Sequence, residues 1–507
     1  MTSSISGRWL AVKADGSAIA RRCSTASQCL TQPVDIAALA VFRILFGVLM
    51  CGGTLRFISN GWIESLYVQP EFHFKYWGFE WVQVPGAEGL YLLYSAIALS
   101  AALVAIGAFY RIAIVSFFCL FSYAELMDVT YYLNHYYFVS LLALILCLLS
   151  PHRAWSVDVW RKPALYRRQL PAWQLWWLRY QVALLYFYAG LAKFEADWLL
   201  HAQPLNIWLP PLGGMPVLGP LLELPWVHFL FSWFAFAFDT TIVAFLLMRK
   251  TRIPAFMVVL VFHLFTHLFF NIGLFPLIMV LAAALFLDPS WPRHRLSDMH
   301  AIGSRLASLM GWRPVPPVTP ASSVEVSQEA SGPSSYHSRT LPTLPTLPTL
   351  AITAFCLFQF FMPLRHWLYP GTVLWNEQGM RFSWKVMLRE KSGSLQYRVV
   401  AVDGETRIVT PGEYLTEQQY REMAGQPDLI LQLAHHIRDE YNARGDGPVS
   451  VFADSLVSLN GRATTELIDP EANLAEIDDG VGIAHWITAA PEQAPQLQQT
   501  LRLVARE

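Results

Sequence analysis

The segment YFYAGLAKFEADW, residues 186–198, carries the side chains best suited to chemistry. An apolar run ends at Lys193, and Glu195, Asp197 and Trp198 follow at once. Apolar surroundings disfavour an ammonium ion, so a buried amine can stay neutral and accept a proton. The alternative is a lysine whose head reaches water and pairs with one of the two acids. Such close pairing would hold Lys193 protonated and oppose a role as a base.

Three histidines supply further polar groups. His135 stands in the motif NHYY at 134–137, and His263 and His267 stand one helical turn apart in an apolar run. A histidine pair at this spacing can ligate a metal, but no third ligand is evident and we expect no metal. The alternatives are a hydrogen-bonded helix-end histidine at 135 and packed histidines bonded to carbonyls at 263 and 267.

The composition places these residues in a membrane protein. The chain has 507 residues, of which 54% are hydrophobic and only 14% charged, with a mean hydropathy of +0.36. That is too apolar for an ordinary soluble protein. The 19 Trp and 32 Phe suit aromatic belts at membrane interfaces. A net charge of −1 gives no field that would attract nucleic acid, so we expect no nucleic-acid partner.

Nine apolar segments are long enough, or nearly so, to cross a bilayer. They are 36–55, 89–109, 112–127, 132–149, 173–193, 226–248, 254–270, 275–288 and 347–367. With a cytoplasmic N-terminus, the inner segments carry 18 Lys and Arg, whereas the outer loops carry only Arg56 and Lys75. The predicted fold is therefore an all-α polytopic membrane bundle of about nine transmembrane helices, N-in and C-out.

The predicted domains follow from these spans. Residues 1–35 form a cytoplasmic segment, 36–288 hold helices one to eight, and 347–368 form the ninth. Residues 289–346 form a cytoplasmic linker, because Pro, Ser and Thr dominate it and LPTLPTLPTL is of low complexity. Residues 369–507 are predicted to be a small extracytoplasmic α+β domain.

Periodicity predicts the elements of this last domain. Alternating apolar residues predict strands at 381–389, 395–401 and 449–459, and helical spacing predicts a helix over 430–441. Asp403-Gly404 predicts a hairpin turn after the second strand.

The predicted topology gathers the ionisable groups. Lys193, His135, His263 and His267 all fall in the outer half of the membrane layer, on three helices. Ionisable residues inside a membrane are costly and by default mark a functional site. Asp239, in the sixth span, is equally unusual, but the sequence assigns it no role.

Several motifs occur in a defined order along the chain. They are NHYY at 134–137, PHRAWSVD at 151–158, AGLAKFEADW at 189–198, VFHLFTHLFFNIGLFPLIMV at 261–280, SWPR at 290–293, PLRHWLYPG at 363–371 and RFSW at 381–384. Together they resemble the vitamin K-dependent gamma-carboxylase family, also described as the horizontally transferred transmembrane domain. The resemblance covers roughly 36–470. The animal members have two adjacent lysines, whereas Ala192 precedes Lys193 here.

The resemblance implies a reaction and residue roles. Lys193 would deprotonate reduced vitamin K, a naphthohydroquinone, and His135 would assist the carbon dioxide or carbanion chemistry. O2 and CO2 would be co-substrates, with no metal. Oxygen addition would give a strong base that removes the γ-proton of a glutamyl side chain, and the quinone would leave as the epoxide. Six residues are assigned to substrate binding: Asn134, Tyr136, His263, His267, Asp197 and Trp198.

The expected partners are a Glu-containing protein or peptide, a quinone and membrane lipid. The cysteine-free C-terminal region cannot form the disulfide that joins the membrane and outer domains in animal members. This favours a multi-pass protein of a bacterial inner membrane with a periplasmic C-terminal domain. Two alternatives stay open: a quinol epoxidase or oxygenase without carboxylation, and a transporter or lipid-binding scaffold. No internal symmetry of the kind common in transporters is evident.

Overall fold

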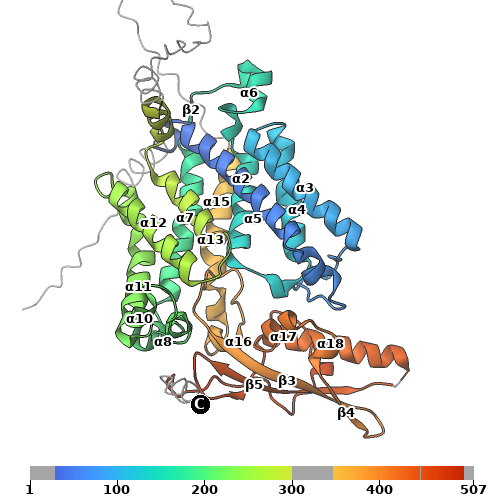
Figure 1. The fold of residues 1–507 in the computed structure, drawn as a ribbon. Coiled ribbons are helices and arrows are strands. Elements are labelled where there is room, and N and C mark those ends of the chain that lie inside the picture. Colours follow the sequence, from blue (N-terminus) through green and yellow to red (C-terminus); the bar gives the residue numbers. More distant parts are fainter. Residues whose placement is uncertain (1–28, 300–345, 446, 496–507) are drawn as a thin grey trace, which may run out of the picture.

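The computed structural model describes residues 29–299, 346–445 and 447–495. Helices build the larger part, and a domain with a small sheet lies at one end of the helical bundle (Figure 1). Most of the predicted N-terminal segment and most of the predicted linker lie outside the described residues.

A helix occupies each of the nine apolar segments. The nine are α2 (Ala37–Ser59), α3 (Ala87–Ile106), α4 (Tyr110–Leu126), α5 (Asn134–Leu148), α7 (Trp173–Ala192), α11 (Pro225–Leu247), α12 (Arg252–Phe269), α13 (Phe275–Ala283) and α15 (Thr346–Phe361). Four of them, α2, α3, α11 and α12, are long and apolar enough to cross a membrane. The count rises to five if Phe275–Phe286 and Trp291–Met299, bent by 99°, form one span. A mostly helical membrane protein is thus confirmed, whereas nine spans with N-in and C-out orientation stay a prediction.

Shorter elements connect these helices. They are β1 (Pro33–Asp35), α6 (Val157–Arg161), β2 (Gln169–Pro171), α8 (Ala196–His201), α9 (Leu205–Trp208), α10 (Gly219–Leu222) and α16 (Val373–Asn376). The strands β1 and β2 pair antiparallel at the end of the bundle away from the sheet domain.

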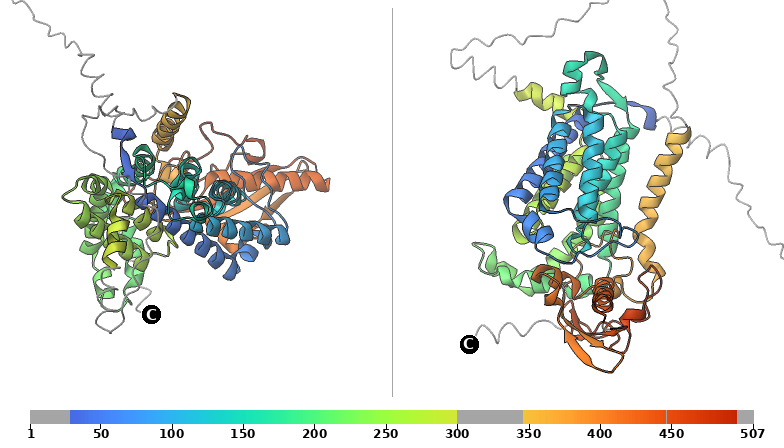
Figure 2. Two further views of the ribbon diagram at one scale, coloured as in Figure 1. Left: turned by 90° about the horizontal axis from the view of Figure 1, so that it is seen from above. Right: turned by 90° about the vertical axis from the view of Figure 1, so that its right-hand side faces the viewer.

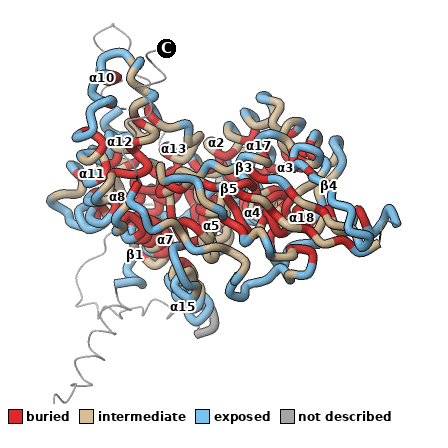
Figure 3. The backbone as a smooth tube through the Cα atoms, turned by 90° about the horizontal axis from the view of Figure 1, so that it is seen from below, coloured by how far each residue is buried: buried red, intermediate tan, exposed pale blue. Residues whose placement is uncertain are grey.

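Helices that follow one another in the sequence pack side by side. The helix α13 contacts both α2 and α7 and so joins the two parts of the bundle. Gly47 lets α2 approach α3, because a Cβ there would lie 2.5 Å from the Ala105 nitrogen. Buried residues run through the middle of the bundle, along α5 and α7, while α15 is largely exposed at the edge (Figure 3).

Buried arginines donate hydrogen bonds to carbonyl groups at helix ends inside the bundle. Arg43 donates to the carbonyls of Val104 and Ala105 at 2.9 and 3.0 Å, and Arg179 donates to the Leu285 carbonyl at 2.8 Å. The last carbonyls of a helix have no partner within the helix. The guanidinium groups supply these missing donors and fix the helices relative to one another.

The C-terminal domain contains a four-stranded antiparallel sheet in the order β4-β3-β5-β6. Its elements are β3 (Lys391–Val400), β4 (Thr406–Val409), α17 (Glu417–Met423), α18 (Pro427–Arg444), β5 (Ser450–Leu459) and β6 (Thr465–Glu466). The helix α18 lies between the sheet and the bundle (Figures 1 and 2). The predicted hairpin at Asp403-Gly404, the helix over 430–441 and the strand over 449–459 are confirmed.

The predicted strand over 381–389 is wrong. This segment forms turns, and Phe382, Trp384 and Met387 adopt left-handed φ angles of 63°, 59° and 57°. Trp384 is fully buried and stacks on Tyr137 of α5, with ring centroids 5.1 Å apart. The apolar alternation thus reflects side chains inserted into the end of the bundle rather than one face of a sheet. Left-handed φ angles are costly for bulky residues and persist only where packing enforces them.

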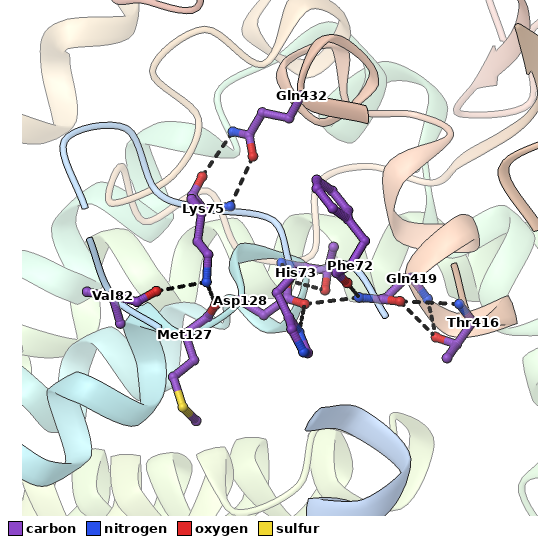
Figure 4. Close-up of polar contacts among 10 residues, drawn as sticks. Phe72, His73, Lys75, Val82, Met127, Asp128, Thr416, Gln419 and Gln432 are labelled. Atoms are coloured by element: carbon purple, nitrogen blue, oxygen red, sulfur yellow. Dashed lines mark hydrogen bonds and ion pairs between the residues drawn. The ribbon is translucent and has the colours of Figure 1, made fainter. Parts of the chain in front are cut away.

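Polar contacts join the two parts of the molecule (Figure 4). The buried carboxylate of Asp128, before α5, accepts the Gln419 amide of α17 at 3.0 Å and contacts His73 Nδ1 at 3.1 Å. The Gln432 side chain of α18 pairs with the backbone N–H and C=O of Lys75, each at 3.0 Å. Because buried polar groups cost free energy unless hydrogen-bonded, these contacts fix how the domain sits on the bundle.

Candidate active site

A cavity of about 110 Å³ lies among α7, α11, α12 and the start of α13. Phenylalanines dominate its wall: Phe231, Phe234, Phe262, Phe265, Phe269, Phe270 and Phe275. Val386 and Met387, from the loop before β3, also line it, so the C-terminal domain helps to enclose the space. Only a few polar side chains reach this wall, and they define its chemistry.

Lys193 lines the cavity and pairs with Asp239. Its Nζ lies 2.8 Å from Asp239 Oδ2 and 3.2 Å from the Ala189 carbonyl oxygen. Both side chains are more than nine-tenths buried, with exposures of 7% and 8%. The Trp198 ring lies beside the ammonium, 5.2 Å away. The alternative in which Lys193 reaches water and pairs with Glu195 or Asp197 is therefore wrong, because its partner lies on another helix.

Gly190 explains why α7 and α11 approach each other closely beside Lys193. A Cβ on Gly190 would lie 2.7 Å from Thr240 Cγ2 and 2.9 Å from the Thr240 nitrogen. The backbones of α7 and α11 thus touch one turn before Lys193, and this places Asp239 opposite the amine. Sequence reasoning missed the pair, although an isolated acid in an apolar helix was the signal that could have found it.

A second polar group in the cavity wall is the Tyr186–His263 pair. The tyrosine hydroxyl lies 3.0 Å from His263 Nε2. His263 Nδ1 is buried and has no hydrogen-bond partner among the described residues. Buried polar atoms are normally paired, so this nitrogen is free to bond a ligand, as a donor or an acceptor according to its tautomer.

The two acids after Lys193 have partners in the C-terminal domain. Asp197 accepts from both terminal nitrogens of Arg462 at 2.7 and 2.6 Å, and from Asn460 Nδ2 at 2.8 Å. Burial raises the pKa of this carboxyl, but the hydrogen bonds of Arg462 and Asn460 outweigh burial and hold the pKa below its ordinary value. The stabilisation is therefore complete above the ordinary aspartate pKa and is lost only as the pH falls through the lowered one. Glu195 Oε1 lies 3.3 Å from Lys385 Nζ.

We expect Arg462→Ala to loosen the C-terminal domain. Loss of a two-pronged, charge-assisted contact should cost about 1.5–3 kcal/mol, because such bonds are stronger than neutral ones. Hydrogen exchange of β3 and β5 should then accelerate, while the exposed control Arg407→Ala on β4 should leave it unchanged. An unchanged exchange rate with a raised KM for substrate would instead favour substrate binding by Asp197.

The remaining predicted site residues lie outside the cavity wall. His135 is half-buried at the start of α5, and the Phe275 ring lies 5.6 Å from it and 6.2 Å from the His263 ring. Asn134 donates to the Lys385 carbonyl at 3.4 Å, and Tyr136 packs edge-on against a phenylalanine of α4. His267 is exposed. The structure therefore brings Lys193, Trp198 and His263 together in one cavity wall, and the roles of all the site residues stay predictions.

The comparisons with known proteins agree with this architecture. The family model for the HTTM domain matches residues 31–291, just over half of the chain. The model for the lumenal domain of vitamin K-dependent gamma-carboxylase matches residues 345–493. The chain belongs to the vitamin K-dependent gamma-carboxylase family. No solved structure matches it.

Both family domains contribute residues to the cavity wall. This gamma-carboxylase-like membrane protein builds most of the cavity from its HTTM domain, and the lumenal-type domain contributes Val386 and Met387. The second domain is the kind that lies on the extracellular side of a membrane. The Lys193–Asp239 pair thus stands in a cavity enclosed by both family domains.

Proposed function

We propose that this protein is a membrane enzyme that couples oxygenation of reduced vitamin K to its epoxide with carboxylation of glutamyl side chains. The observation that carries the proposal is the buried Lys193–Asp239 pair at the wall of an aromatic cavity. A buried ion pair in so apolar a place costs free energy, and a catalytic use explains its presence.

The chemistry of the cavity wall suits a naphthohydroquinone. Its phenylalanine wall offers faces and edges against which a flat bicyclic ring can pack. The two hydroxyls of a hydroquinone need hydrogen-bonding partners, and the cavity offers Lys193 and the unpartnered His263 Nδ1. When bound, reduced vitamin K would supply the electrons for oxygenation and the strong base that the γ-carbon proton requires.

The Lys193–Asp239 pair can accept the first proton, which comes from a hydroxyl group of the hydroquinone. A ligand that fills the cavity excludes water, and in a dry site the neutral pair is favoured over the ionic one. The proton then moves across the 2.8 Å contact from Nζ to Oδ2. The freed amine accepts the hydroxyl proton of the hydroquinone, and the resulting ammonium stabilises the negative charge left on that oxygen.

His135 would serve the second half of the reaction. It lies across Phe275 from His263, and its neighbour Asn134 contacts the Lys385 carbonyl of the C-terminal domain. A glutamyl side chain entering between the bundle and this domain would reach His135, and its γ-carbon would have to meet the edge of the cavity, where the quinol supplies the base.

A quinol epoxidase without carboxylation is the second candidate, since His135 lies outside the cavity wall. The deciding experiment supplies purified protein with vitamin K hydroquinone, oxygen, labelled bicarbonate and a Glu-rich peptide. We expect both epoxide and labelled peptide. Epoxide without label would select the second candidate, and neither product from quinone-bound protein would refute both.

His135→Ala should separate the two products. We expect incorporation of labelled carbon dioxide to fall about 10²-fold, in line with loss of a positioned acid–base group. Epoxide formation should stay near the wild-type rate because the cavity is intact. The exposed His294→Ala provides the matched control. Equal loss of both products would show that His135 does not serve the carboxylation step alone.

A further inference from the structure

A second, cationic pocket lies at the end of the bundle opposite the C-terminal domain. Its volume is about 280 Å³, and its lining residues come from the start of α4 and from the segment around α6. Figure 1 shows α6 at the end of the bundle away from the sheet domain. The charged and polar residues of its wall are Arg111, His152, Asp158, Arg161 and Lys162. It shares no residue with the quinol cavity and does not depend on the proposed function.

The charges of this pocket do not cancel. Asp158 is its only acid, and its two oxygens accept the backbone N–H groups of Phe109 and Tyr110 at 2.9 and 3.0 Å. That carboxylate therefore caps the first turn of α4. Lys162 has no side-chain partner within the described ranges, and Arg161 only lies over the Phe109 ring at 4.4 Å. The wall thus keeps an excess of positive charge with free N–H donors.

A buried histidine supplies an independent sign of a ligand. His152 is 7% exposed and stacks on Tyr110, with ring centroids 4.7 Å apart. Its Nδ1 is buried and has no hydrogen-bond partner among the described residues. Burial, helped by the charge of Arg111, lowers the pKa of His152 to about 4, so the ring is neutral near pH 7. A neutral imidazole can carry its proton on Nδ1 and donate to an anion.

The rim of the pocket is apolar. Phe109 and Ile112 are 55% and 70% exposed, and they lie at the N-cap and in the first turn of α4. Trp160, in α6, is 82% exposed beside the cationic wall. A cationic wall next to an exposed apolar rim matches the junction between a phosphate headgroup and its acyl chains, whereas a soluble phosphate would use only the cationic part. Basic pockets at membrane ends are a recurrent mode of lipid headgroup recognition.

We propose that this pocket, formed by Arg111, His152, Arg161 and Lys162, binds the phosphate of an anionic phospholipid in the leaflet opposite the C-terminal domain. Arg161 and Lys162 supply the free charge. Arg111 is already held by the Cys147 carbonyl at 2.7 Å and by Ser150 Oγ at 2.9 Å, so it offers a fixed guanidinium with donors left over.

Native mass spectrometry and thermal unfolding of the full-length protein test the proposal. The protein is purified in a neutral detergent and given phosphatidylglycerol, phosphatidylcholine or inorganic phosphate. We expect phosphatidylglycerol to stay bound and to raise Tm, with little effect of phosphatidylcholine. In Arg161→Gln/Lys162→Gln, retention should fall at least about tenfold, which corresponds to the loss of about 1.4 kcal/mol of binding free energy. The matched control Arg249→Gln/Lys250→Gln removes two exposed charges outside the pocket and should behave as wild type.

Two results would overturn the proposal. Equal retention of phosphatidylglycerol by the double variant and its control would show that the pocket holds no lipid. Stabilisation by phosphate alone, with the two lipids indistinguishable, would replace the lipid by a soluble phosphate ligand. Should the double variant fold poorly, Lys162→Gln alone keeps the test valid, because this side chain makes no described contact.

Discussion

Replacing Lys193 with methionine should lower the rate of epoxide formation by about 10²- to 10⁴-fold, the range for loss of a positioned base. Methionine keeps an unbranched apolar side chain of similar length but cannot accept the hydroxyl proton. The Asp239 carboxyl that remains can take up a proton and stay neutral in the cavity, so the fold should persist. Binding of quinone should weaken but persist, because the aromatic wall and His263 are unchanged.

The measurement is chromatographic detection of epoxide from vitamin K hydroquinone under saturating oxygen. Lys250→Met removes an exposed lysine outside the cavity and should retain the wild-type rate. Quinone binding, followed by fluorescence quenching, separates lost chemistry from lost binding. A Lys193→Met protein that binds quinone and forms epoxide at the wild-type rate would show that this amine is not the base.

Asp239→Asn should be the most destabilising single change at the site. It leaves the Lys193 ammonium in an apolar cavity without its counter-charge, and breaking a buried pair in this way costs about 3–5 kcal/mol. Lys193→Met/Asp239→Leu removes both charges and should recover most of that stability, because an apolar pair of similar volume can replace a buried ion pair. The double variant should remain without epoxidase activity.

The free energy of unfolding can be followed by chemical denaturation in detergent. Asp454→Asn is the matched control: its contact with Arg398 is long, at 3.5 Å, and about one-third exposed, so its loss should cost less than about 1 kcal/mol. If Asp239→Asn lowers the free energy of unfolding no more than this control does, the Lys193–Asp239 pair does not hold α7 against α11. If the double variant regains both stability and epoxidase activity, the Lys193–Asp239 pair is not required for catalysis.

The sequence predicted elements whose signal is local. Apolar length predicted a helix in each of the nine segments, and alternation with Asp403-Gly404 predicted the hairpin of β3 and β4. Alternation failed at 381–389, where side chains such as Trp384 pack into the bundle instead of a sheet. The same two-residue period describes both cases, and only the three-dimensional environment distinguishes them.

The site was predictable only in part for a related reason. Lys193, Trp198 and His263 stood out as polar or amphipathic groups in apolar runs, and the cavity joins them. The partner of each acid could not be read from the sequence, because Asp197 meets Arg462 across 265 residues. The pairing of Lys193 with Asp239 likewise depends on the contact of Gly190 with Thr240, which exists only once α7 and α11 pack together.

A structure of the protein with reduced naphthoquinone bound tests the central claim most directly. The account predicts the ring between the phenylalanines of α11 and α12, with one oxygen within about 2.6–3.2 Å of Lys193 Nζ, the distance for proton transfer to a base. A ring bound elsewhere, with Lys193 still paired to Asp239 and out of contact with the ligand, would contradict it.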